Sequence, residues 1–158
     1  MPGYRKHLTV GFCVYVMGIW ALRMSGHQHS IATGVEWLLC CLAGSLFPDI
    51  DVKSKGQYYF YGILLLVLIA LTACKSYVMV ACLSITSYVP LLVRHRGVFH
   101  NPLFITTLSA VMWCIACTNC PRYAHVLSLD IVFFVAGALS HIWLDIGLSN
   151  GLRKYITR

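Results

Sequence analysis

Four short polar motifs in an otherwise apolar chain carry most of its acidic and imidazole side chains. They are His7, residues 47–51 (FPDID), residues 95–100 (HRGVFH) and residues 141–145 (HIWLD), and together they hold three of the five acids and four of the seven histidines. Imidazole and carboxylate groups bind zinc, manganese and similar divalent ions. Apolar chains rarely contain such groups without a function, so the motifs predict a metal site.

His141 and Asp145 lie four residues apart in a segment that we expect to be helical. Both side chains then project from one helix face and can bind a common ion. The alternative is a His–Asp hydrogen bond that ties two helices together. An unpaired aspartate in an apolar helix is costly, which favours a paired or metal-bound role for Asp145.

Asp49 and Asp51 follow Pro48 closely. We expect Pro48 to end the preceding helix and the residues around it to be extended, with both carboxylates on one side. They would form a corner rich in oxygen atoms. The alternative is a helix-end turn with solvated aspartates, which Lys53 and Lys55 could neutralise.

His95 and His100 are five residues apart, a spacing that does not place them on one helix face. We therefore expect a bend, permitted by Gly97 and closed by Asn101 and Pro102. Histidine is the side chain that most commonly binds transition metals, so both imidazoles are candidate ligands.

Three further residues complete the candidate set. Arg94 and Arg96 flank His95 and are suited to binding a phosphate, although anchoring at a membrane interface is a role that they could fill at the same time. His7 follows two basic residues. It is the least specific candidate ligand, because it could contact a lipid headgroup instead.

The candidate ligands thus comprise four imidazoles and three carboxylates. This set predicts two or three divalent ions, with zinc first and manganese second. Such sites lower the pKa of water toward ~7 and hold phosphoryl oxygens between ions about 3.5–4 Å apart. We expect one of the three aspartates to serve as general base in place of, or beside, binding metal. The seven candidate ligands are His7, Asp49, Asp51, His95, His100, His141 and Asp145.

The elements that must position these residues are membrane helices. Hydrophobic residues make up 59% of the 158 residues and charged residues 11%, and the mean hydropathy is +0.75. This composition excludes an ordinary soluble domain and predicts an all-α, polytopic membrane bundle of about five to six helices in a single domain, residues 1–158. The apolar runs cover residues 8–24, 31–47, 58–74, 77–93, 103–117 and 126–146.

The basic residues predict how such a bundle is oriented. With both termini in the cytoplasm, nine of the twelve lysines and arginines lie on the cytoplasmic side and three lie outside, as the positive-inside rule expects. The three are Arg23, Lys75 and Arg122. This topology gathers all four motifs at the cytoplasmic interface. It places His27, His29 and His125 on the opposite side, where we expect solvated or interfacial roles.

The positive net charge of +7 is explained by this topology, so we expect no nucleic-acid partner and infer no obligate protein partner. The cysteines expected to be core residues of the apolar runs are Cys13, Cys40, Cys41, Cys74, Cys82 and Cys114. Cys117 and Cys120 have CxxC spacing but stand alone. If their loop is periplasmic, a disulfide between these two cysteines is an alternative.

In order and spacing, the motifs resemble those of the YdjM-like family of membrane-bound metal-dependent hydrolases of the bacterial inner membrane. The pattern comprises His7 with Gly11, PDxD at 48–51, HRGxxH at 95–100 and SHxxxD at 140–145. That family is distantly similar to zinc phospholipase C and to fungal zinc nucleases. The resemblance implies phosphoester hydrolysis. Because the chain is short and its loops are brief, they leave little material for a large substrate domain, and we expect the substrate to be a membrane lipid, as a phospholipid or lipid phosphate.

Two other functions fit parts of the pattern. A divalent-cation transporter or metal sensor would also place histidine and aspartate within a membrane. Transport predicts polar residues that continue to the other face, where Glu36 and Asp130 are the main candidates. A purely structural protein would use the polar residues to lock helices together, which does not explain their gathering on one side.

Overall fold

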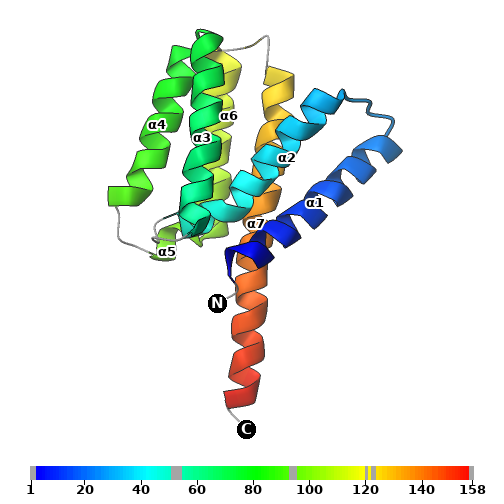
Figure 1. The fold of residues 1–158 in the computed structure, drawn as a ribbon, viewed down its shortest axis with the longest axis vertical. Coiled ribbons are helices and arrows are strands. Elements are labelled where there is room, and N and C mark those ends of the chain that lie inside the picture. The colour runs from blue at the N-terminus through cyan, green and yellow to red at the C-terminus, as the bar shows by residue number, and fades with distance from the viewer. Residues whose placement is uncertain (1–2, 51–54, 93–95, 120, 122–123, 157–158) are drawn as a thin grey trace.

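A computed structural model describes residues 3–50, 55–92, 96–119, 121 and 124–156. Within these ranges the regular secondary structure is all helical, with no strand, which confirms the all-α prediction (Figure 1). The elements are α1 (Tyr4–Met24), α2 (Ile31–Leu46), the 3-10 helix η1 (Phe47–Asp49), α3 (Lys55–Ala73), α4 (Tyr77–Leu92), the single turn α5 (Arg96–Phe99), α6 (Pro102–Asn119) and α7 (Ala124–Ile156).

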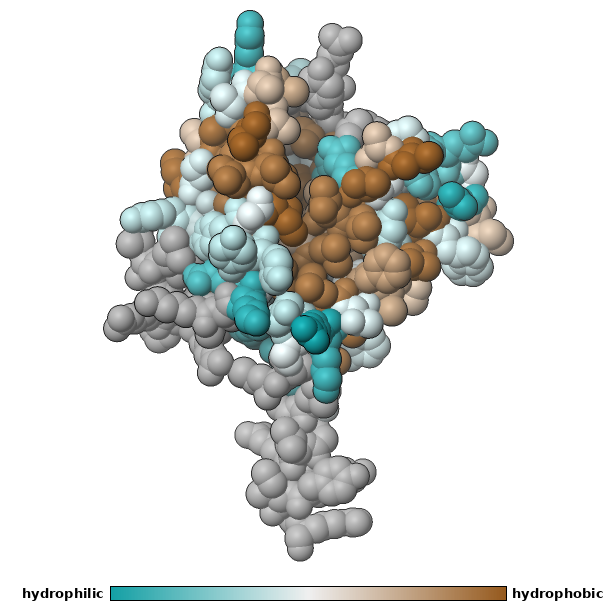
Figure 2. Space-filling model, in the orientation of Figure 1, coloured by the Kyte–Doolittle hydropathy of each residue, from teal (hydrophilic) through white to brown (hydrophobic). Residues whose placement is uncertain are grey.

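Five of the described helical stretches are long and apolar enough to cross a membrane. The apolar part of α4, Tyr77–Tyr88, is shorter. On the face shown in Figure 2, apolar residues form a broad area across the middle of the bundle, as expected of a surface in contact with lipid. The spans are Tyr4–Met24, Ile31–Asp49, Lys55–Ala73, Pro102–Asn119 and Leu127–Gly147.

The six apolar runs of the sequence correspond to the six long helices, but several helices begin earlier than hydropathy indicates. Helix α1 begins at Tyr4 rather than at residue 8, so His7 lies in its first turn. Helix α3 begins at Lys55 rather than at residue 58. Polar residues at a membrane interface can continue a helix beyond its apolar core, and hydropathy alone does not detect them.

The extended conformation predicted around Pro48 is wrong. Helix α2 does end before this proline, but residues Phe47–Asp49 continue as a 3-10 turn, and Ile50 keeps helical dihedral angles of φ −68° and ψ −24°. Proline at the start of a helical turn lacks only a donor that would be unpaired there, and its fixed φ suits the turn. Asp49 therefore lies on a tight turn, and Asp51 lies outside the described residues.

The predicted bend at Gly97 is also wrong, because Gly97 lies within the helical turn α5. The chain changes direction after Phe99 instead. Asn101 accepts a hydrogen bond from the backbone N–H of Leu103 (2.9 Å) and so caps α6, whose first residue is Pro102. This part of the prediction, closure at Asn101 and Pro102, agrees with the structure.

Helices α2 and α7 form the closest pair in the bundle. A Cβ atom added to Gly44 would overlap the backbone of Phe134, and one added to Gly137 would overlap the backbone of Cys41. Only glycine allows two helix backbones to approach so closely, as is common between membrane helices. The contact fixes the end of α2 against the middle of α7.

The long helices run alternately up and down the bundle (Figure 1). One end therefore collects the start of α1, the end of α2 with η1, the turn α5 and the start of α6, with α7 passing beside them. Residues from all four motifs are thereby brought to this end of the bundle.

Candidate metal centre

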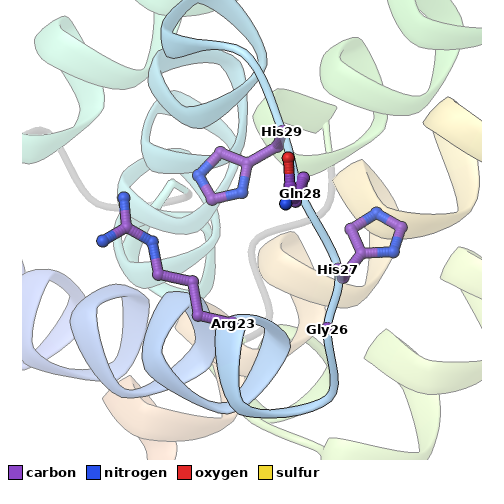
Figure 3. Close-up of a pocket in the computed structure, with 5 residues that line it drawn as sticks. All are labelled: Arg23, Gly26, His27, Gln28 and His29. Atoms are coloured by element: carbon purple, nitrogen blue, oxygen red, sulfur yellow. The ribbon is translucent and has the colours of Figure 1, made fainter.

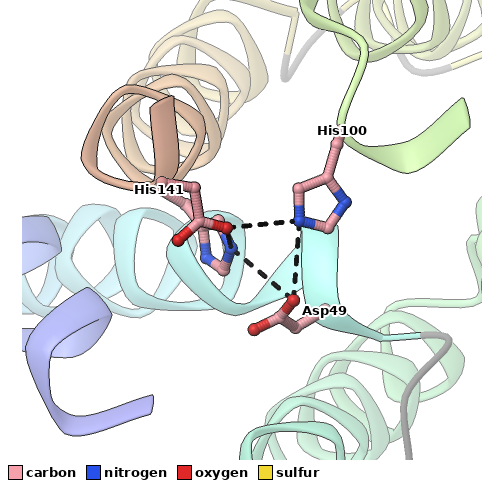
Figure 4. Close-up of side chains that lie close together, drawn as sticks. Asp49, His100 and His141 are labelled. Carbon is pink, nitrogen blue, oxygen red and sulfur yellow. Dashed lines mark ion pairs between the residues drawn. The ribbon is translucent and has the colours of Figure 1, made fainter. Parts of the chain in front are cut away.

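Four side chains from three parts of the chain form one group that could hold a metal ion. Asp49 comes from η1, His100 from the link between α5 and α6, and His141 and Asp145 from α7. One ligand atom from each lies within 4.8 Å of all the others. Figure 4 shows Asp49, His100 and His141 converging from their separate elements.

Nitrogen and oxygen atoms alternate around this group. The Nε2 atom of His100 is 3.6 Å from Oδ1 of Asp49 and 3.5 Å from Oδ2 of Asp145. The Nε2 atom of His141 is 3.7 Å and 3.4 Å from the same two oxygens. Direct hydrogen bonds are shorter, at about 2.7–3.2 Å. An ion with bonds of about 2.0–2.1 Å in tetrahedral geometry holds its ligand atoms about 3.3–3.4 Å apart.

The group is largely but not wholly enclosed. The side chain of His141 is 0% exposed, while Asp145, His100 and Asp49 are 16%, 21% and 29% exposed. The Nε2 atoms of both histidines are buried and have no hydrogen-bond partner among the described residues. Buried polar atoms are rarely left unsatisfied, so the donor set fits a cation.

The orientation of His141 is set by its second nitrogen. The Nδ1 atom lies 2.7 Å from the backbone carbonyl oxygen of Ser45, to which it donates a hydrogen bond when it carries the proton. Ser45 lies in the last turn of α2, where carbonyl groups lose their intrahelical donors. This contact leaves Nε2 as the lone-pair nitrogen facing the cluster, the usual arrangement for a metal-binding histidine.

A group of phenylalanines supports the elements that carry Asp49 and His100. The ring of Phe47 lies 5.8 Å from that of Phe99 and 5.3 Å from that of Phe134, both in edge-to-face geometry. Phe47 also contacts Phe60 of α3. These contacts fix η1 and α5 against α3 and α7. The adjoining ligands are thus attached to a packed core.

His7 lies directly beside the four-residue group. Its Nε2 atom is 3.6 Å from Oδ1 of Asp145, and its ring stacks on that of His141 with centroids 3.7 Å apart. His7 is 1% exposed although it follows two basic residues near the N-terminus. The interpretation of His7 as a lipid-headgroup contact does not fit this burial.

Five of the seven predicted ligands are therefore brought together, counting His7 beside the four-residue group. The remaining two, Asp51 and His95, lie outside the described residues, as does Arg94. Of Arg96 the structure describes the backbone, at the start of α5. The predicted phosphate-binding role of the two arginines stays a prediction.

The carbonyl group of Ser45 was not predicted. No side-chain pattern identifies a backbone acceptor, but one indirect signal exists in the sequence. Gly44 and Ser45 are small residues next to the polar motif at Pro48, and small residues in membrane helices indicate close approach of another helix.

The opposite end of the bundle carries a surface depression lined by Arg23, Gly26, His27, Gln28 and His29 (Figure 3). His29 lies 4.9 Å, and His27 6.3 Å, from the indole of Trp37, measured between ring centroids. Neither belongs to the four-residue group, and no other such group occurs among the described residues. The possible disulfide at Cys117 is untested because Cys120 lies outside the described residues.

A family model described as "YdjM inner membrane protein" matches residues 1–155, which is nearly the whole chain. Neither a curated protein nor a solved structure matches the chain significantly.

Proposed function

The chain belongs to the YdjM inner membrane protein family, and we propose that it is a metal-dependent hydrolase that cleaves a phosphoester at the membrane surface. The observation that carries this proposal is the ring of alternating histidine nitrogens and aspartate oxygens 3.4–3.7 Å apart. Such a mixed donor set suits zinc or manganese better than calcium, because imidazole supplies half of the atoms.

A divalent ion held by Asp49, His100, His141 and Asp145 supplies Lewis acidity and lowers the pKa of water toward ~7. His141 is held in place by Ser45 and needs no rearrangement to bind. Asp49 is the most exposed of the four. We therefore propose that Asp49 is the aspartate best placed to accept a proton from an attacking water.

The substrate that we propose is a membrane lipid carrying a phosphoester, as a phospholipid or a lipid phosphate. The partly exposed group lies at one end of helices whose sides are apolar, so a headgroup can reach it without leaving the bilayer. We propose that this end faces the cytoplasm, in accord with the distribution of basic residues. Arg94 and Arg96 would then steady the phosphate charge.

The test is hydrolysis of phospholipids and lipid phosphates by the purified protein in vesicles, followed as phosphate or headgroup release. Wild type should release product, a chelator should stop release, and zinc or manganese should restore it. Asp49→Ala and His141→Ala should each lower the rate more than about 100-fold. Activity that survives both substitutions would exclude this mechanism.

One observation favours a second function, divalent-cation transport. Asp130 is buried in α7, and its Oδ1 atom has no hydrogen-bond partner among the described residues. It lies eleven residues before His141, or about 16 Å along the helix. An ion path could use both positions. Uptake of zinc or manganese into sealed proteoliposomes, lost in Asp130→Asn, would support transport over hydrolysis.

A further inference from the structure

We propose that the site holds a pair of ions, with His7 as the ligand that defines the second position and Asp145 as the carboxylate that bridges the two. This inference rests on the proposed metal site and extends it beyond the four-residue group. It begins from the two oxygens of Asp145, which face different histidines.

The Oδ2 atom of Asp145 belongs to the four-residue ring, 3.5 Å from Nε2 of His100 and 3.4 Å from Nε2 of His141. The Oδ1 atom lies 3.6 Å from Nε2 of His7. This second separation falls in the same range as the first set and exceeds hydrogen-bond length. The Oδ1 atom is buried and accepts no hydrogen bond from the described residues.

The imidazole rings of His7 and His141 lie close together and face one carboxylate. His7 and His141 stack almost in parallel, with an interplanar angle of 13° and ring centroids 3.7 Å apart. Each directs its Nε2 atom at a different oxygen of the same carboxylate. The 3.7 Å between the ring centroids is comparable with the 3.5–4 Å that separates the ions of two-metal hydrolytic sites.

Burial supports the same conclusion. His7 is 1% exposed and His141 is 0% exposed, and they come from different helices, α1 and α7. Two buried rings from separate helices thus direct their Nε2 atoms at one shared carboxylate, which joins them in a single group of ligand atoms. The start of α1 is therefore a part of the metal site and does more than anchor the chain.

Electron paramagnetic resonance of the manganese-loaded full-length protein in detergent tests this proposal. Two manganese ions at this spacing, joined by a carboxylate, should give an exchange-coupled spectrum and a content of two ions per chain. His7→Gln should bind one ion fewer and give the six-line signal of an isolated ion. The matched control is His27→Gln in the loop that follows α1, which should keep the coupled pair.

A wild-type protein with one isolated ion would overturn the inference, whether or not the variants fold. So would a coupled pair that persists in His7→Gln. The proposed hydrolysis fails separately: a coupled pair without phosphoester cleavage contradicts the function alone, while cleavage by a single-ion protein contradicts the pair alone. A wild-type protein that binds no manganese or zinc contradicts both.

Discussion

The two ends of the bundle both carry histidines, but in the described residues their surroundings differ. At one end, His100 and His141 face the carboxylates of Asp49 and Asp145. At the other end, His29 lies against the indole of Trp37 beside an open depression (Figure 3).

The difference teaches that histidines beside a hollow surface do not by themselves form a group that could hold a metal ion. The depression near His29 draws its lining from one helix end and the adjoining loop. The candidate metal group takes its atoms from η1, from the link before α6 and from α7, and these atoms alternate between nitrogen and oxygen. The four-residue group differs in two respects: its residues come from distant parts of the sequence, and contacts around them fix their orientation.

The largest expected effect separates the two ends by metal content. His141→Ala removes a fully buried nitrogen from the ring, and it should reduce bound zinc or manganese to background and the hydrolytic rate more than about 100-fold. His27→Ala should leave both unchanged. Elemental mass spectrometry with a circular-dichroism check of helix content gives the measurement, and equal metal content in the two variants would remove the distinction between the ends.

The next effect concerns the helix contact that supports the metal end. Gly137→Ala would place a Cβ atom into the backbone of Cys41, and it should destabilise the protein by about 1–3 kcal/mol or more. Gly147→Ala lies on the same helix with nothing within 4 Å, so it should be neutral or stabilising by up to ~1 kcal/mol. Thermal unfolding in detergent compares them, and similar midpoints would contradict the close approach of α2 and α7.

A smaller effect compares two aspartates, one in the four-residue group and one distant from it. Asp49→Asn keeps the volume of a partly exposed side chain but removes its charge, so affinity for zinc should fall more than tenfold, or about 1.4 kcal/mol. Asp130→Asn, distant from the ring, should change affinity by less than about twofold. Competition with a chelating dye measures both. Equal losses of affinity in the two variants would mean that Asp130 also governs metal binding.

The smallest effect concerns the contact between α3 and α4, beside the core cluster that contains Phe47 and Phe99. The hydroxyl of Tyr61 in α3 donates a hydrogen bond to the carbonyl of Ser87 in α4 (2.8 Å), so Tyr61→Phe should cost about 0.5–1.5 kcal/mol without changing metal content. Tyr58→Phe alters a side chain that is 79% exposed and serves as its control. Loss of metal in Tyr61→Phe would show that the packing of α4 reaches the metal end.

The fold was largely predictable because the bilayer requires long apolar helices, and each of the six apolar runs became one. Local conformation at the motifs was less predictable. Pro48 favoured an extended chain by its effect on neighbouring residues, yet packing of Phe47 against Phe99 and Phe134 holds a 3-10 turn there. Tertiary contacts outweighed the local preference.

The candidate site was predictable in its residue types but not in its arrangement. The four-residue spacing of His141 and Asp145 placed both on one face of a helix, as the structure has them. The contact of His141 with a backbone carbonyl and its stacking on His7 depend on how α1, α2 and α7 cross. Sequence spacing within one helix contains no information about such crossings.

The central claim is that the ring formed by Asp49, His100, His141 and Asp145 holds a divalent ion. Elemental mass spectrometry of wild-type protein, purified in detergent without added metal or chelator, tests it most directly. The account predicts zinc or manganese at one ion per chain or more. Folded, monodisperse protein that contains no metal, and that takes up none from micromolar zinc or manganese, would contradict it.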